Sequence, residues 1–132
     1  IECFNKNIKE SNVVLYPYGL SSHSHNAEQG TNDTHLNFVL GDTEPRDGDI
    51  ECRSLDSFNF TEVDYIKIDV DGFEIPLLKG AKETLRKNNP VINIEMKQRK
   101  RPETVRKCRD ILHSLGYKRH LRTKSDEVWL KS

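Results

Sequence analysis

The sequence predicts an α/β fold with a mostly parallel sheet that ends in a C-terminal antiparallel hairpin. Three observations predict this class. Short apolar strands alternate with amphipathic helical patterns over residues 65–115, a proline stands near the start of each helix, and two strand-like stretches around a polar turn close the chain. With 132 residues the chain has the length of one domain and shows no internal repeat, so residues 1–132 are taken as a single domain.

Composition excludes several classes of protein. Hydrophobic residues make up 34% and charged residues 32%, and the large aliphatic and Phe residues exceed the share typical of disordered chains. No apolar run approaches the ~18 residues of a membrane span and no signal-peptide pattern opens the chain, so no membrane partner is expected. Cys3, Cys52 and Cys108 are too widely spaced to favour a disulfide framework or a zinc site, which predicts a reducing, cytoplasmic setting.

A net charge of zero conceals a strong asymmetry. Residues 1–78 hold 5 basic and 15 acidic side chains, whereas residues 79–124 hold 15 basic and 4 acidic ones. A basic half is typical of a surface for nucleic acid or for an anionic substrate. Solvated helix faces explain the same pattern and are the favoured interpretation, so nucleic acid is not an expected partner.

The first half of the chain gives weak local signals. Residues 13–16 are β-branched and aromatic and predict a strand that ends at Pro17, because proline cannot continue a central ladder. Neighbouring segments are predicted as the end of a helix over 5–12, a polar loop over 21–33, strands over 36–40 and 50–55, and a turn over 41–49. His23 and His25 alternate in the loop, but no third ligand stands at metal-binding spacing, so a solvated loop is favoured.

The second half gives clearer signals for strands. Residues 65–70 are apolar on both faces except at Lys67, as in a buried parallel strand. A helix with Pro76 near its start carries apolar residues as far as Leu85, and residues 91–96 predict the next strand. These three elements form the expected centre of the domain.

The last elements are a helix and a hairpin. Pro102 opens the helix, whose apolar face includes Cys108, and Gly116 stands where a C-terminal cap belongs. The closing strands are expected over 117–121 and 127–130. Both Cys108 and Trp129 are interpreted as core residues.

Three acidic residues mark a candidate site. Asp69, Asp71 and Glu74 fall at or just after the end of the strongest predicted strand, and Gly72 permits a sharp turn between them. In open α/β sheets ligands bind beyond the carboxyl ends of the strands, where carboxylates can bind a metal, orient a hydroxyl or act as a general base. The alternative is that Asp71 or Glu74 caps the following helix. The two roles are compatible.

Several motifs resemble one known family. The segments are SLDS at 54–57, VDYIKIDVDGFE at 63–74, LKGA at 78–81, PVINIE at 90–95 and LGY at 115–117. Together they resemble the FkbM-type S-adenosylmethionine-dependent methyltransferases over roughly residues 50–117. The long central motif is specific, with one conservative departure: Asp71 stands where the family has Glu. Residues 13–21 are similar to the family's third strand.

The resemblance implies a Rossmann-like class I methyltransferase fold, with S-adenosylmethionine as cofactor and no metal ligand. The implied reaction is O-methylation, on the hydroxyl of a sugar or another small metabolite. The donor is a sulfonium cation, which carboxylates suit electrostatically. The resemblance assigns candidate catalytic roles to Asp69, Asp71, Glu74 and Lys67, and candidate cofactor contacts to Gly19, Leu20 and Asp69. Gly19 and Leu20 would border the adenine, and Asp69 would lie near the methyl group and the acceptor.

One part of the family pattern is missing. The seven glycines include no Gly-x-Gly spacing, and no acidic residue is placed to hold a ribose after a second strand. The chain is therefore expected to be an N-terminally truncated, partial methyltransferase domain, or to bind the cofactor in another way. Half a sheet leaves an exposed edge, which a second copy in a homo-oligomer or the missing segment would cover.

Two alternatives belong to other functional classes. One is a non-catalytic interaction module with the same fold. The other is a magnesium-dependent nuclease, in which Asp69 and Glu95 would hold the metal and Lys97 would stabilise charge at the attacked phosphate. The basic run at 97–101 would suit a phosphate backbone, but this pattern leaves the motif at 71–81 unexplained.

Overall fold

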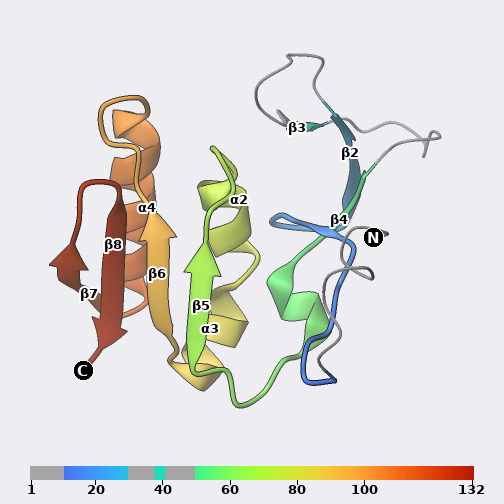
Figure 1. Ribbon diagram of the computed structural model, residues 1–132, viewed down its shortest axis with the longest axis horizontal. Helices are drawn as coiled ribbons and strands as arrows, with labels where there is room; N and C mark the ends of the chain where they lie inside the picture. Colours follow the sequence, from blue (N-terminus) through green and yellow to red (C-terminus); the bar gives the residue numbers. More distant parts are fainter. Residues whose placement is uncertain (1–10, 30–37, 41–49) are drawn as a thin grey trace.

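The computed structural model describes residues 11–29, 38–40 and 50–132 (Figure 1). The chain forms eight strands, a short 3-10 helix and three α-helices among these residues. In chain order they are β1 (Gly19–Leu20), β2 (His25–Gln29), β3 (Phe38–Leu40), β4 (Ile50–Arg53), η1 (Leu55–Phe58), β5 (Tyr65–Ile68), α2 (Glu74–Lys79), α3 (Lys82–Asn88), β6 (Val91–Glu95), α4 (Pro102–Ser114), β7 (Tyr117–Arg122) and β8 (Asp126–Lys131).

The strands form two four-stranded sheets, and both are mixed. The first has the order β1-β4-β2-β3 and the second the order β5-β6-β8-β7. Each contains one parallel pair, β1 with β4 and β5 with β6, and the other pairs are antiparallel. The prediction of an α/β fold is confirmed, but the prediction of a mostly parallel sheet is wrong. The closing hairpin inserts β8 beside β6, and a short turn can join β7 and β8 only as antiparallel neighbours.

The hydrophobic core lies between the second sheet and the three α-helices, which cover one face of that sheet (Figure 1). Ile68 of β5 pairs with Ile94 of β6, and Ile92 pairs with Trp129 of β8, so alternate residues point to the helices. Trp129 is 1% exposed and Cys108 is fully buried, which confirms that both are core residues.

Helix α4 follows the capping chemistry that its sequence predicts. Pro102 is its first residue, and Val105, Cys108 and Leu112 form its buried face. Gly116 follows the helix with φ +85°, a left-handed conformation that glycine adopts without steric cost. The chain then enters β7 directly.

The strand predicted over 13–16 is not formed. Residues 13–16 pair with no other strand among the described residues. The Tyr16 ring instead packs edge-on against the rings of Phe58 and Phe60, with each pair of ring centroids 5.3 Å apart. The strand lies further on, where Gly19–Leu20 pairs with β4. Within the predicted loop, β2 pairs with both β4 and β3, so pairing partners override a polar composition.

The single helix predicted from Pro76 to Leu85 is two helices that meet at Gly80. The Gly80 N–H donates to the Pro76 carbonyl at 3.1 Å, but the Gly80 carbonyl accepts from the Asp56 N–H at 2.8 Å instead of continuing a helix. The Asp56 carboxylate then accepts from the N–H of Thr84 at 2.8 Å. A side chain from η1 thus caps α3 from outside, which the local sequence of α3 does not reveal.

Several sequence predictions lie outside the described residues. They include nearly all of the helix end at 5–12, the first two residues of the strand at 36–40, the turn at 41–49 and the part of the loop after residue 29. Among the described helices, none combines the length and the apolar character that a membrane crossing requires.

Candidate active site at the ends of two parallel strands

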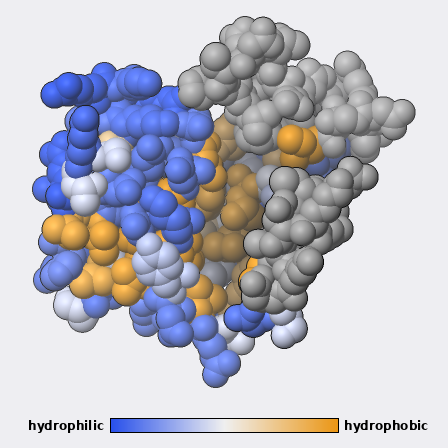
Figure 2. Space-filling model, in the orientation of Figure 1, coloured by the Kyte–Doolittle hydropathy of each residue, from blue (hydrophilic) through white to orange (hydrophobic). Residues whose placement is uncertain are grey.

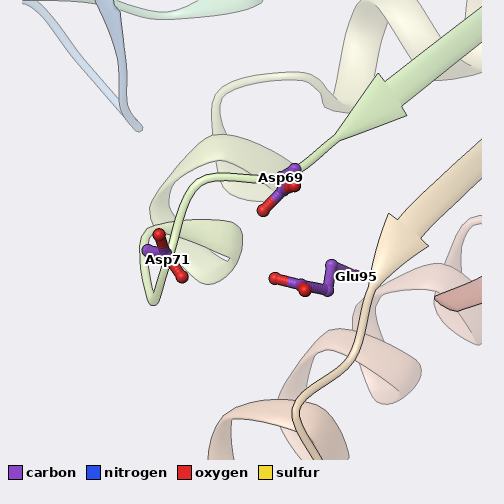
Figure 3. A group of neighbouring side chains, drawn as sticks. All are labelled: Asp69, Asp71 and Glu95. Atoms are coloured by element: carbon purple, nitrogen blue, oxygen red, sulfur yellow. The ribbon is translucent and has the colours of Figure 1, made fainter. Parts of the chain in front are cut away.

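Three carboxylates meet where β5 and β6 end. Because these strands are parallel neighbours, their carboxyl ends lie at the same edge of the sheet. Asp69 follows β5, Glu95 is the last residue of β6, and Asp71 lies in the turn after β5 (Figure 3). One carboxylate oxygen from each residue lies within 4.8 Å of the others. The structure therefore brings the predicted residues Asp69 and Asp71 together and adds Glu95.

The turn after β5 owes its shape to two residues with positive φ. Asp71 has φ 45° and Gly72 has φ 106°, and the Phe73 N–H donates to the Val70 carbonyl at 3.2 Å. Only glycine adopts the second conformation readily. A Cβ at residue 72 would also lie 2.9 Å from Nη1 of Arg101. The glycine is therefore required by the backbone of the turn, and a larger residue would also make the Arg101 guanidinium shift.

Lys97 joins two of the three carboxylates. Its Nζ lies 3.1 Å from Glu95 Oε2 and forms a second ion pair with Asp71. The hydrogen bond to Asp71, followed by that to Glu95, raises the pKa of Lys97, so the side chain stays charged. Asp69 is exposed and makes no ion pair or hydrogen bond within the part of the chain that the structure describes. Its carboxylate is thus the one available to a ligand.

The other two predicted catalytic residues lie apart from this cluster. Glu74 is 5% exposed, and its Oε1 accepts from the Gly72 N–H at 3.0 Å, so the carboxylate holds the turn in place. The alternative that Asp71 or Glu74 caps the following helix is wrong, because no side chain caps α2 and Glu74 is its first residue. Lys67 lies within β5, and its Nζ is 3.4 Å from Asp126 Oδ1 on β8.

A second feature is an apolar cavity of about 290 Å³. Its lining residues are Tyr18, Gly19, Leu20, Cys52, Val70 and Phe73. It therefore contains both residues predicted to border an adenine, together with two residues from the turn that carries Asp71. Gly19 is also required by packing within the first sheet, since a Cβ there would lie 2.7 Å from Cys52 Sγ.

An apolar groove of about 320 Å³ runs along β5. Leu20, Leu55, Phe60, Ile66 and Leu77 are among its lining residues. Figure 2 shows hydrophobic side chains in the hollow beside the residues drawn in grey. Tyr65 of β5 is 55% exposed at this side of the sheet. The apolar surface next to the candidate site is therefore partly uncovered among the described residues.

The sequence assigns Glu95, Lys97 and the basic run at 97–101, which includes Arg101, only to the nuclease alternative. It assigns Val70 and Phe73 to no site. The signal for Glu95 was present, because a carboxylate that ends the strand parallel to β5 must lie near Asp69. No local signal identifies Arg101, whose place depends on how the loop after β6 folds back on Gly72.

The fold is similar to a crystal structure described as methyltransferase FkbM from Methylobacillus flagellatus KT. The two chains share 17% sequence identity with a TM-score of 0.57, and the match covers 97% of this chain and 30% of that one. This chain thus spans less than a third of that protein's length. No curated protein matches the chain significantly. The profile of the family described as methyltransferase FkbM domain matches residues 3–119 of the 132, and the chain therefore belongs to this family.

Proposed function

We propose that this protein is an S-adenosylmethionine-dependent methyltransferase that methylates a hydroxyl group of a sugar or another small metabolite. Family membership supports the reaction class, and one observation in the structure carries the mechanism. Asp69 is an exposed carboxylate without a partner among the described residues, beside two carboxylates that both form ion pairs with Lys97. An oxygen nucleophile must lose its proton as it attacks, and a carboxylate in this position can accept it.

The residues present fit the adenine end of the cofactor. The 290 Å³ cavity is apolar, and Tyr18 and Phe73 in its wall offer aromatic surface to a flat ring. Gly19 and Leu20 supply backbone at its edge, and Val70 connects the cavity to Asp69 in the chain. When bound, S-adenosylmethionine would supply an electrophilic methyl group. No described residue supplies a glycine-rich turn for its carboxypropyl end.

The chain's own residues then have separate tasks. Asp69 would accept the proton of the acceptor hydroxyl and hold that oxygen in place for the reaction. Lys97 fixes Asp71 and Glu95, so that the turn keeps one geometry while the acceptor binds. Glu74 and Gly72 hold the same turn from behind. Acceptor positioning thus supplies much of the rate enhancement that this site would provide.

The test is the substitution Asp69→Asn in the full-length protein. Transfer of a radiolabelled methyl group to a panel of hydroxyl-bearing sugars and metabolites should fall by roughly 10²-fold or more. Asp110→Asn is the matched control, because Asp110 is an exposed acid on α4, and it should leave the rate unchanged. Unchanged transfer by the Asp69 variant would remove this carboxylate from the mechanism. Unfolding of that variant would assign it a structural role.

The nuclease alternative has one observation in its favour, since Asp69, Glu95 and Lys97 do lie together. The position of Lys97 opposes it, because the ammonium group already pairs with Glu95, one of the two carboxylates that would have to hold the metal ion. A magnesium titration followed by NMR at the carboxylates separates the two functions. Tight binding that requires both Asp69 and Glu95 would favour the nuclease.

A further inference from the structure

The loop between β6 and α4 places a group of cations beside the carboxylate cluster. Arg99 and Lys100 are exposed and Arg101 is half-buried, and none of the three side chains has a hydrogen bond or ion pair within the described residues. Most other arginines of the described chain do have an acidic partner, as Arg53, Arg86, Arg106, Arg109 and Arg119 show. Among the described arginines, Arg99, Arg101 and Arg122 have no acidic partner, and two of these three lie in this loop, at the edge that carries the candidate site.

The loop is a compact turn with a defined backbone. The N–H groups of Lys100 and Arg101 both donate to the Lys97 carbonyl, at 3.0 and 2.8 Å. Lys97 is itself fixed by Asp71 and Glu95, so the turn is tied to the carboxylate cluster at its first residue. The three cations after Lys97 thus project from a rigid base. Little conformational entropy of the backbone remains to be lost when a ligand binds them.

Arg101 has the most restricted position of the three. Its guanidinium lies against Gly72, where a Cβ would come within 2.9 Å of Nη1. The same side chain lines a small cavity of about 10 Å³ together with Glu74, Glu95 and Lys97. A half-buried guanidinium loses part of its hydration and gains no acidic partner in return, which is unfavourable unless a ligand supplies the negative charge.

We infer that Arg101, with Arg99 and Lys100, binds a phosphate group of the acceptor, so that the substrate is a phosphorylated hydroxyl compound of small size. This inference rests on the proposed function and names the substrate class of the same site. The planar guanidinium offers paired N–H donors that match phosphate oxygens. The acceptor hydroxyl then reaches Asp69, while its phosphate group is held on the other side of the Gly72 turn.

The surroundings favour a small ligand over nucleic acid. Asp69, Asp71 and Glu95 lie within 4.8 Å of one another next to the basic loop, and Lys97 neutralises only part of their charge. A polyanionic backbone that continued past the loop would meet these carboxylates. A ligand with a single phosphate group avoids them, because it presents a neutral hydroxyl to the acidic side and its charge to the basic side.

The test measures binding without any methyl donor, so it does not depend on catalysis. Inorganic phosphate and glucose 6-phosphate are titrated into the isotope-labelled full-length protein and followed by NMR, with glucose as the uncharged comparison. Both phosphates should bind in the millimolar range and shift the amide signals of residues 97–101, and glucose should not. Arg101→Gln should weaken phosphate binding at least tenfold, and Arg101→Lys should weaken it less.

The matched control is Lys87→Gln. Lys87 is exposed in the last turn of α3, which leads into the opposite end of β6, and the substitution removes one positive charge as well. Its phosphate affinity should equal that of the wild type. If Arg101→Gln fails to fold, the double variant Arg99→Gln, Lys100→Gln serves instead, since both side chains are exposed.

Several results would overturn the inference, and they are distinct from failure of the proposed function. One is phosphate binding that Arg101→Gln and Lys87→Gln change equally, or no phosphate binding at all. Another is binding of a short DNA duplex that is tighter than binding of glucose 6-phosphate and weakens with salt as contacts to several phosphates require. Methyl transfer to neutral sugars at a rate that Arg101→Gln does not change would likewise refute the phosphate site, while the proposal of a methyltransferase would stand. Conversely, phosphate binding that depends on Arg101, with no methyl transfer to any acceptor, would refute only the proposed methyltransferase activity.

Discussion

Replacing Gly80 by alanine should loosen the contact between the end of α2 and the segment that follows β1. Gly80 has φ −84°, which alanine adopts without strain. Space is what the site lacks: a Cβ at residue 80 would lie 2.1 Å from the carbonyl oxygen of Ser21 and 3.0 Å from Ser54 Cβ. Ser21 is 1% exposed, and its N–H donates to the Arg53 carbonyl at 2.9 Å. The backbone at Ser21 therefore has to move.

The magnitude follows from two opposing effects. At a compatible φ, Gly→Ala stabilises a protein by about 0.4–1 kcal/mol through the unfolded chain. Forcing an extra methyl into a packed site costs about 1–3 kcal/mol, and loss of the Ser21 hydrogen bond adds roughly 1 kcal/mol. The steric effect is larger, so Gly80→Ala should lower the free energy of unfolding by about 1–3 kcal/mol. At this chain length each kcal/mol corresponds to a fall in Tm of roughly 3–5 °C.

Urea unfolding followed by the fluorescence of the buried Trp129 measures this change. Gly116→Ala is the control: its φ is +85° and the added Cβ would lie 3.6 Å from Lys131 Cε, an ordinary contact, so only backbone strain opposes it. Both variants lose stability, but only Gly80→Ala should also weaken binding of S-adenosylmethionine, because Ser21 adjoins Gly19 and Leu20 of the apolar cavity. A Gly80→Ala protein as stable as the wild type would refute the reasoning.

Two further predictions concern buried ionisable groups. Glu127 is 1% exposed and pairs with both Arg109 and Arg119, so Glu127→Gln should cost about 2–4 kcal/mol in urea unfolding, and a loss below about 0.5 kcal/mol would contradict it. Burial, followed by the nearby charges of Glu74 and Glu127, raises the pKa of Cys108 from 9.0 to about 12. The stability that comes from keeping this thiol protonated in the folded state is therefore complete below pH 9.0 and is lost as the pH rises toward 12. Because the thiols of Cys52 and Cys108 are buried, in a Cys3→Ser variant they should react with a thiol reagent at pH 8 only as fast as the protein unfolds. Rapid labelling of Cys108 in the folded protein would disprove this.

Elements whose signals are local were predicted well. The strands at β5 and β6, the helix α4 with Pro102 at its start, and Gly116 before the closing hairpin all follow from residues within each element. The family resemblance, which rests mainly on the segments around β5 and β6, is confirmed as well. In each case burial and hydrogen bonding reinforce what the local sequence favours.

Elements that depend on distant partners were predicted poorly. The exposed residues 13–16 have strand composition but pair with no strand in the part of the chain that the structure describes, whereas the polar β2 lies between two partners. The helix break at Gly80 depends on Ser21 and on Asp56, which are far away in the sequence. Local composition cannot report these contacts, because their energies arise from residues outside the segment.

The candidate site explains the charge asymmetry of the sequence. Asp69 and Asp71 belong to the acidic half of the chain, and Lys97 and Arg101 belong to the basic half. The two halves meet at the turn after β5, where Lys97 binds Asp71 and the Arg101 guanidinium lies against Gly72. A side chain at residue 72 would strain the turn that carries Asp71, and the Arg101 guanidinium would have to shift. In the proposed function, this turn would hold Asp71 beside the proton acceptor Asp69, and the Arg101 guanidinium next to Gly72 would bind the phosphate group.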